Sequence, residues 1–311
     1  MTGRRRQKRP SLSLVGAGVV GTTLTTLLAK ERYRVLSIIG RNGPAAVQLA
    51  RSVACPRVST EIADLDRTAD VILFTVRDAD LAPAVKSLAS IKGLKLRGKV
   101  VLHTSGVHSA GILAPLRKSG ASVASFHPLQ TFPGNAAPAR LRASVRGIYF
   151  GIDGDSPAVE VAKKLAADLG GKPLDVPAEM RPVYHAAAVF ASGYLAAVMN
   201  AVASLSKAAR LELPWTELFG PLMTATMENT VRSSPAEAVT GPVIRSDLDT
   251  ISLHLGALEK FAPEFVPLYT VGALEVARVA VARGKLSREA YAELLSTFRS
   301  AIRGGKRRGG K

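Results

Sequence analysis

A glycine-rich turn near the start of the chain constrains its fold more than any other feature. The apolar run Ser11–Val15 leads into Gly16-Ala17-Gly18-Val19-Val20-Gly21, and leucines at helical spacing follow. A strand, a G-x-G-x-x-G turn and a helix in this order are typical of a dinucleotide-binding unit. The first glycine allows the tight turn, the second admits a pyrophosphate close to the backbone, and the third lets helix and strand pack closely. We therefore predict that residues 16–21 bind the phosphates of a cofactor, at a helix N-terminus that offers free N–H groups.

Strand-like and helix-like segments alternate after this turn. The apolar runs predicted as strands are Arg34–Ile39, Asp70–Val76, Lys99–His103, Ala121–Phe126 and Val145–Gly151. Alternation of this kind, with strands that are continuous apolar runs, predicts βαβ units and a mostly parallel sheet. We expect an α/β, Rossmann-like cofactor-binding domain at residues 11–152, in which residues 132–143 form a loop.

Helical patterns dominate from residue 153 to residue 300. We predict an all-helical second domain over residues 153–300, which binds substrate and forms a homodimer. Within it, Ala186–Leu205 is nearly all apolar and long enough to span a membrane. Its alanines, together with Ser192 and Asn200, are more typical of a helix buried on all sides inside a protein. We expect no membrane association.

Positive charge concentrates at the two ends of the chain. The formal net charge is +18, and residues 1–10 and 299–311 together hold eleven basic residues and no acid. We predict that residues 1–10 and 301–311 are basic disordered tails that make at most weak, non-specific contacts with nucleic acid. The one cysteine, Cys55, excludes an intramolecular disulfide, and no secretory signal pattern is present. These features favour a cytoplasmic protein.

The residues that follow the second predicted strand favour NADP over NAD. A site that prefers NAD carries Asp or Glu at this point for the ribose hydroxyls. This chain has Gly40-Arg41-Asn42 instead. Arg41 is predicted to pair with the 2′-phosphate of NADP, and Asn42 to add a hydrogen bond. The alternative is that Arg41 is a solvated surface residue.

Polar residues also follow the next strands, at the edge where an open α/β sheet binds its ligands. The predicted cofactor contacts at this edge are Val76, Arg77, Asp78 and Thr104. The predicted substrate contacts are His103 and Ser105, together with Arg245 of the second domain. Arg245 could clamp a substrate carboxylate with two parallel hydrogen bonds, or it could form an ion pair with Asp247 or Asp249.

Two histidines are the candidate catalytic residues. His185 lies near the start of the apolar helix, just after Pro182, and imidazole titrates close to neutral pH. It could therefore donate a proton to a substrate oxygen or nitrogen. His127 precedes Pro128, which restrains its backbone at the end of a strand. Either could instead be a structural histidine. The five histidines have no metal-ligand spacing, so no metal is predicted.

Four segments together resemble a known family. They are Leu102–Gly111, Ser125–Pro133, Val183–Ala191 and Thr240–Asp247. The chain is similar over nearly its whole length to Rossmann-like proteins that carry domain of unknown function 2520. These are relatives of ketopantoate reductase and of the 6-phosphogluconate and 3-hydroxyisobutyrate dehydrogenases. The resemblance implies an NADP-linked oxidoreductase with a helical second domain, often a homodimer.

The chain departs from its wider relatives at two positions. The 3-hydroxyacid dehydrogenases place Lys-x-x-x-Asn where this chain has His185 and Val189, and members of the closer group tend to have Asn where it has Gly193. The leading hypothesis is an NADP(H)-dependent oxidoreductase that transfers hydride to or from a small 2-oxo acid or imine, with a ketopantoate-like substrate as a candidate. The two departures favour the alternative, a non-catalytic NADP-binding redox-sensing or regulatory protein. A nucleic-acid-binding protein is a third hypothesis, which depends on the tails alone.

Overall fold

The computed structural model describes residues 9–308, with side chains described up to residue 299. It divides into two compact units between Ser192 and Gly193. The strands of the first unit are β1 Ser11–Val15, β2 Arg34–Ile39, β3 Val58–Ser59, β4 Val71–Phe74, β5 Val100–His103, β6 Ser122–Pro128, β7 Tyr149–Gly154 and β8 Lys172–Asp175. Its helices are α1 Val19–Lys30, α2 Gly43–Ser52, α3 Asp78–Ala89, α4 Ala114–Arg117, α5 Pro138–Ala143, α6 Ser156–Asp168 and α7 Arg181–Val189, with short helical turns at Ile62–Asp64, Ala110–Leu113 and Ala178–Met180.

These strands form one sheet in the order β3-β2-β1-β4-β5-β6-β7-β8. Every neighbouring pair is parallel except β6 and β7, which are antiparallel. The predicted α/β fold with a mostly parallel sheet is confirmed. The chain leaves β1 toward β2 on one side and later continues through β4 on the other. In sheets of this kind the reversal of strand order creates a crevice at the carboxyl end of the first strand.

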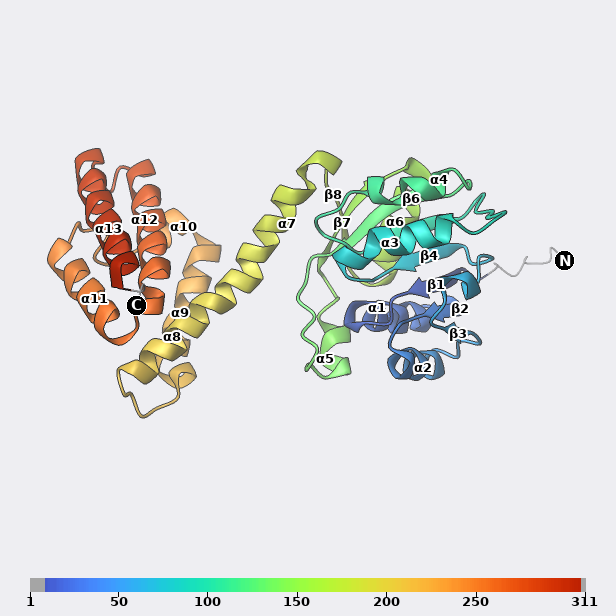
Figure 1. Ribbon diagram of the computed structural model, residues 1–311, viewed down its shortest axis with the longest axis horizontal. Helices are drawn as coiled ribbons and strands as arrows, with labels where there is room; N and C mark the ends of the chain where they lie inside the picture. The colour runs from blue at the N-terminus through green and yellow to red at the C-terminus, as the bar shows by residue number, and fades with distance from the viewer. Residues whose placement is uncertain (1–8, 309–311) are drawn as a thin grey trace. The chain divides into compact units, whose positions relative to one another are not determined.

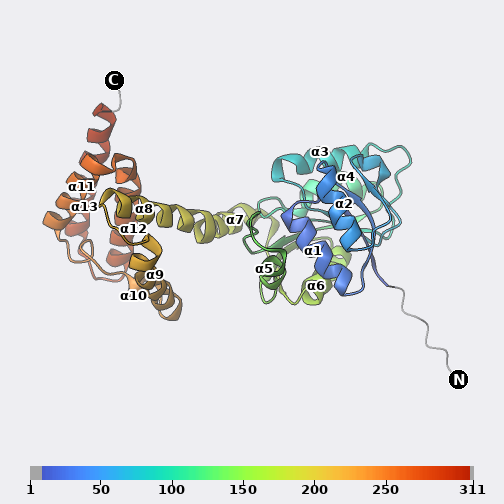
Figure 2. The same ribbon diagram turned by 90° about the horizontal axis from the view of Figure 1, so that it is seen from below.

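Helices cover both faces of the sheet (Figures 1 and 2). Because successive residues of a strand point to opposite faces, the buried strands supply two separate hydrophobic clusters. Val71 and Leu73 of β4 pack with α1, α2 and α6, whereas Ile72 and Phe74 pack with α3 and α4. This double burial explains why β4 is a continuous apolar run in the sequence.

The first compact unit ends later than the predicted domain boundary at residues 152/153. Helix α6 packs on the sheet, and β8 adds a parallel strand next to β7. Residues 156–175 therefore belong to the first compact unit, which contains the sheet. The predicted loop at residues 132–143 also contains a helix, α5. Pro138 is its first residue, a position where proline has no N–H to lose and a favourable φ.

The second unit consists of helices, as predicted. They are α8 Leu195–Ala208, α9 Trp215–Arg232, α10 Pro235–Ala238, α11 Leu248–Phe261, α12 Val266–Ala282 and α13 Arg288–Arg308, with a π-helical turn, η4 Phe190–Tyr194, before them and a short turn at Pro263–Phe265. Ile251, Ala277 and Phe298 are fully buried in its core, which α11, α12 and α13 supply. The predicted tail at residues 301–311 is helical up to Arg308, because α13 continues beyond its buried anchor Phe298. Residues 309–311, and residues 1–8 of the other predicted tail, lie outside the described residues.

The long apolar helix is not buried within the chain, contrary to the prediction for Ala186–Leu205. Helical structure runs over Ala178–Ala208, and only 6% of its most apolar window is buried. Val183 and Phe190 are 62% and 65% exposed. Ala178–Ala208 and Pro263–Ala282 are both long and apolar enough to cross a membrane, by length and composition alone. Apolar composition alone therefore did not predict the burial of this helix correctly, because most of its side chains are exposed in the structure.

Candidate functional site

The glycine turn has the geometry that a phosphate-binding loop needs. Gly16 has a φ of 106°, and a Cβ there would lie 2.8 Å from the backbone of Thr75. A Cβ at Gly21 would lie 2.2 Å from the carbonyl oxygen of Gly16. By contrast, a Cβ at Gly18 would meet no heavy atom within 4 Å. Thus the first and third glycines permit close packing, and the second leaves open space above the turn.

The N-terminus of α1 presents its free N–H groups at this open space. Gly18 is the N-cap, no side chain among the described residues caps it, and the first turn contains no acid. The first N–H groups of a helix have no partner within the helix and favour an anion. The residues of the turn therefore fit a dinucleotide pyrophosphate, as the sequence predicted for residues 16–21.

Two arginines meet at one aspartate beside the turn. Arg41 follows β2, and its Nη2 lies 2.5 Å from Oδ2 of Asp80. Arg77 follows β4, and its Nε lies 2.8 Å from the same oxygen. Hydrogen bonding to Arg77 is the largest cause that lowers the pKa of Asp80. Since β2 and β4 flank β1, two cations that share one anion lie beside the predicted cofactor crevice.

The other residues that were predicted to contact the cofactor make contacts within the protein. Asn42 is the N-cap of α2, where its side chain accepts a hydrogen bond from the N–H of Ala45. Val76 packs against a hydrophobic cluster, and Asp78 begins α3. The N–H of Thr104 donates to the carbonyl of Phe74 and so joins the ends of β5 and β4.

His103 holds the loop after β5 in shape. It is fully buried, its Nδ1 accepts a hydrogen bond from the N–H of Ser105, and its Nε2 lies 3.1 Å from the carbonyl oxygen of Ser109. Burial lowers its pKa to about 4, so the ring is neutral at pH 7. The Oγ of Ser105 in turn accepts from the N–H of His108. Both ring nitrogens of His103 are therefore engaged within the protein, which favours a structural role over the predicted substrate contact.

The two predicted catalytic histidines lie together in the first unit. The rings of His127 on β6 and His185 on α7 are 5.9 Å apart and nearly perpendicular. Gly106, in the loop after β5, lies against both. A Cβ there would be 2.5 Å from Cδ2 of His185 and 2.8 Å from Nε2 of His127. The absent side chain at position 106 thus allows both imidazoles to approach the end of β5.

Tyr184 completes this cluster and was not predicted. Its hydroxyl lies 2.9 Å from Nδ1 of His127. His127 pairs across the sheet with Gly151, and a Cβ at Gly151 would lie 2.8 Å from the Tyr184 hydroxyl. A glycine at that register position therefore makes room for the phenol on the sheet.

A buried ion pair fixes the helix that carries Tyr184 and His185. Arg181 is the first residue of α7 and is fully buried. Its Nε lies 2.8 Å from Oδ1 of Asp153 on β7, and its Nη2 donates to the carbonyl of Gly151 at 2.9 Å and to the hydroxyl of Ser125. Burial lowers the pKa of Arg181, and Asp153 opposes that effect. Removing either partner from such a buried pair costs about 3–5 kcal/mol.

The electrostatic surroundings keep His127 neutral. Burial is the main cause that lowers its pKa to about 4, and the charge of Arg181 and the neighbouring His185 act in the same direction. Burial raises the pKa of Tyr184 above its usual value of 10. At pH 7, therefore, a neutral imidazole and a neutral phenol share one hydrogen bond.

The cluster lines a cavity of about 460 Å³. His127, Tyr184 and His185 line it together with residues 129–131 and the following turns of α7. Pockets of this kind, mostly apolar with a few convergent polar groups, are the usual sites for small ligands. Sequence reasoning named both histidines as candidate catalytic residues but missed Tyr184 and Arg181. The available signal was their i,i+3 spacing on an otherwise apolar helix.

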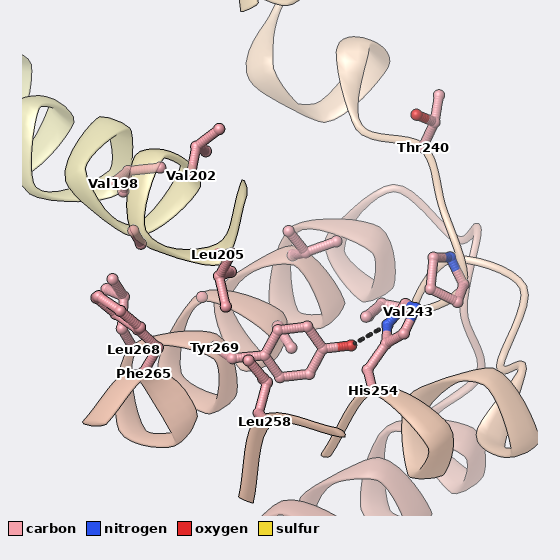
Figure 3. Close-up of a pocket in the computed structure, with 15 residues that line it drawn as sticks. Val198, Val202, Leu205, Thr240, Val243, His254, Leu258, Phe265, Leu268 and Tyr269 are labelled. Atoms are coloured by element: carbon pink, nitrogen blue, oxygen red, sulfur yellow. Dashed lines mark hydrogen bonds between the residues drawn. The ribbon is translucent and has the colours of Figure 1, made fainter. Parts of the chain in front are cut away.

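A second cavity, of about 430 Å³, lies within the second unit and is shown in Figure 3. Valine and leucine side chains of α8, α11 and α12 line it, together with Phe265 of the turn before α12 (Figure 3). Nδ1 of His254 and the hydroxyl of Tyr269, 2.9 Å apart, form its polar wall.

Arg245 belongs to the same unit, in the segment between α10 and α11, where Asp247 caps α11. Among the described residues, no group of three or more His, Cys, Asp or Glu side chains is arranged to hold a metal ion.

Comparison with family models identifies two domains. Residues 1–128 match the Rossmann-like domain, and residues 148–276 match domain of unknown function 2520. No protein with a curated description matches the chain.

Three solved structures illustrate the similarity. A candidate NADP oxidoreductase from Bacteroides fragilis has 24% identity and a TM-score of 0.72, with 87% of this chain and 98% of that chain covered. A protein from Thermotoga maritima has 27% identity and a TM-score of 0.64, with 88% and 99% covered. A reductive aminase from Aspergillus terreus, in complex with NADPH4, cyclohexanone and allyl amine, has 18% identity and a TM-score of 0.54, with 96% and 95% covered. Each aligns over most of this chain, so the similarity includes both domains.

Proposed function

We propose that this chain, which belongs to the Rossmann-like proteins that carry domain of unknown function 2520, is an NADP(H)-dependent oxidoreductase. Its substrate is a small 2-oxo acid or imine, with a ketopantoate-like acid as one candidate. One observation carries the proposal. The same compact unit contains an open glycine turn at the end of β1 and a cluster of two histidines and a tyrosine. In the sheet, β4 and β5 lie between β1 and β6, so the ends of these two strands connect the turn to the cluster.

The similar structures support this class of chemistry. One of them is a candidate NADP oxidoreductase, and another is a reductive aminase bound to a form of NADPH. The reduced nicotinamide, when bound, supplies the hydride. The chain's own residues must then place the substrate and provide a hydrogen-bond or proton donor for its oxygen or nitrogen.

We assign the proton-donor role to His185. Its ring lies at the cavity wall beside Gly106, at the carboxyl end of β5 where the nicotinamide half of the cofactor is expected. Histidine is the side chain that most often donates or accepts a proton in enzyme catalysis. His127, held neutral, is suited to hydrogen bonding rather than to proton donation. Arg245 stays a proposed ligand for a substrate carboxylate.

The arginines beside Asp80 support NADP as the cofactor. A 2′-phosphate that arrives beside Arg41 and Arg77 would be a stronger partner for the two cations than one carboxylate, since it has more charge and three acceptor oxygens. Arg41 and Arg77 are 72% and 77% exposed, so both can reorient toward a ligand at low cost.

The alternative, a non-catalytic NADP-binding protein, depends on Gly193. This residue lies in the π-helical turn Phe190–Tyr194 that joins α7 to α8, and a Cβ there would meet no heavy atom within 4 Å. The backbone therefore has room for the asparagine that related proteins tend to carry, and its amide is absent here. A chain that binds NADPH but reduces no carbonyl or imine would fit this alternative.

We also infer that the chain forms a homodimer. Most of its exposed large apolar side chains lie between residues 180 and 271, on α7, α8, α9, α11 and α12 and on the turns between them. Single chains rarely expose a large apolar surface unless another molecule covers it. A second copy of the chain is a partner that is present wherever the chain itself is present. A cytoplasmic location stays a prediction.

A screen of NADPH oxidation tests the enzymatic proposal. Purified full-length protein is mixed with NADPH and a panel of 2-oxo acids and cyclic imines, and absorbance at 340 nm is followed. We expect turnover of at least one substrate, and a loss of about 10²–10⁴-fold in kcat/KM for His185→Ala. His108→Ala, which removes an imidazole that lines no part of the cavity, serves as the matched control. Binding of NADPH without turnover of any substrate would favour the non-catalytic alternative.

A further inference from the structure

We propose that Tyr184 is a positioning residue for His127. Its hydroxyl donates to Nδ1 of His127, holds that ring as the Nε2–H tautomer, and so presents a neutral N–H donor beside Gly106 and His185. This inference deepens the proposed function, because the donor would polarise the substrate oxygen or nitrogen that His185 protonates. The tautomer itself can be observed without any cofactor or substrate.

The direction of the hydrogen bond follows from the chemistry of its two ends. The Tyr184 oxygen and Nδ1 of His127 are 2.9 Å apart, and the rings meet edge to face. A neutral imidazole has one nitrogen that donates and one that accepts, and the accepting nitrogen is more basic than a phenol oxygen. Tyr184 therefore donates and Nδ1 accepts. The single ring proton must then reside on Nε2.

The surroundings prevent both rings from changing their protonation state at pH 7. Burial is the largest cause of the low pKa of His127. Arg181, His185 and His103 lower this pKa further, and Asp78 opposes them. Burial likewise raises the pKa of Tyr184. A neutral donor next to a neutral acceptor is thus the stable state of this pair over the range in which most enzymes work.

Three residues, Arg181, Gly151 and Gly106, hold Tyr184 and His127 in place. Arg181 anchors α7 through Asp153, and its guanidinium lies 5.8 Å from the centre of the Tyr184 ring. Gly151 makes room for the phenol hydroxyl, and Gly106 makes room for Nε2 of His127. A neutral imidazole whose tautomer is fixed by a partner at its other nitrogen can act as an electrophile in an active site. In the proposed site, His127 has this role and His185 donates the proton.

Nitrogen-15 NMR of histidine-labelled full-length protein tests the proposal without cofactor. The His127 signals are assigned by their disappearance in His127→Gln. At pH 7 we expect a pyridine-type shift for Nδ1 and a pyrrole-type shift for Nε2. In Tyr184→Phe, which keeps the ring and its contact with Arg181, the two shifts should move toward each other as the tautomers mix. Tyr149→Phe, which removes an exposed hydroxyl on the neighbouring strand β7, should leave them unchanged.

Two results would overturn the proposal. One is a pyrrole-type shift for Nδ1 in the wild-type protein, and the other is unchanged His127 shifts in Tyr184→Phe. If Tyr184→Phe fails to fold, Gly151→Ala gives the same test, because its Cβ would displace the phenol hydroxyl. Where turnover is measurable, kcat should fall about tenfold in Tyr184→Phe, the scale of one hydrogen bond, with NADPH affinity unchanged. Absence of turnover would contradict the proposed function and leave the tautomer result valid.

Discussion

The proposed preference for NADP depends on the ion-pair cluster of Arg41, Arg77 and Asp80. Arg41 stands where an NAD-selective site carries an acid, and the structure joins it to Arg77 through their shared carboxylate. Sequence reasoning predicted Arg41 and Arg77 as separate contacts. It could not predict the shared partner, because Asp80 and Arg41 are 39 residues apart and only the sheet order brings them together.

Arg41→Asp should therefore exchange the cofactor preference. The introduced carboxylate repels the 2′-phosphate and can accept hydrogen bonds from the ribose hydroxyls of NAD. We expect NADPH affinity to fall about ten- to hundredfold while NADH affinity stays constant or rises, as measured by fluorescence titration. Arg51→Asp makes the same charge change in the last turn of α2 and should alter neither affinity. Equal NADPH affinity in Arg41→Asp and the wild-type protein would remove Arg41 from the site.

The roles of individual histidines were harder to predict from the sequence than the roles of the glycines in the turn. The glycine turn follows a pattern of spacing that has one structural meaning, so its residues could be predicted individually. His103 and His127 both end or follow a buried strand, yet one holds a loop through both ring nitrogens and the other lines a cavity. The hydrogen-bond partner of Tyr184 could not be predicted from the sequence, because His127 lies 57 residues away.

Helices α7 and α8 show what the sequence can and cannot predict about a single element. The apolar composition of Ala186–Leu205 predicted a long helix, and the structure is helical over Ala178–Ala208, with a π-helical turn at Phe190–Tyr194. It also indicated burial. Composition cannot tell whether the covering surface is the same chain, a second copy or lipid.

A homodimer should cover this helix. We expect size-exclusion chromatography with light scattering to give twice the chain mass at micromolar concentration. Val183→Asp places a charge on an exposed position of α7 and should shift the equilibrium toward monomer, because burying an unpaired charge is costly. Val47→Asp, on an exposed position of α2, should remain dimeric. A monomeric wild-type protein, or one recovered only with membranes, would contradict this expectation.

On the scale of the whole molecule, alternation of strands and helices was enough to predict the fold class. The predicted second domain is helical from Gly193 onward, but α6 and β8 extend the sheet beyond residue 152. Strand β8, KPLD, is short and exposed, so it has no apolar pattern that a sequence could reveal. The end of a sheet domain is therefore hardest to predict from the sequence where its last strand is an exposed edge strand.

The central claim is that the turn at residues 16–21 binds the pyrophosphate of NADP(H). Isothermal titration calorimetry of the full-length protein with NADPH tests it most directly. The account predicts saturable binding of one NADPH per chain, weaker binding of NADH, and loss of both in Gly18→Leu, whose side chain would fill the open space above the turn. Absence of binding heat with both NADPH and NADH, from wild-type protein shown to be folded, would contradict it.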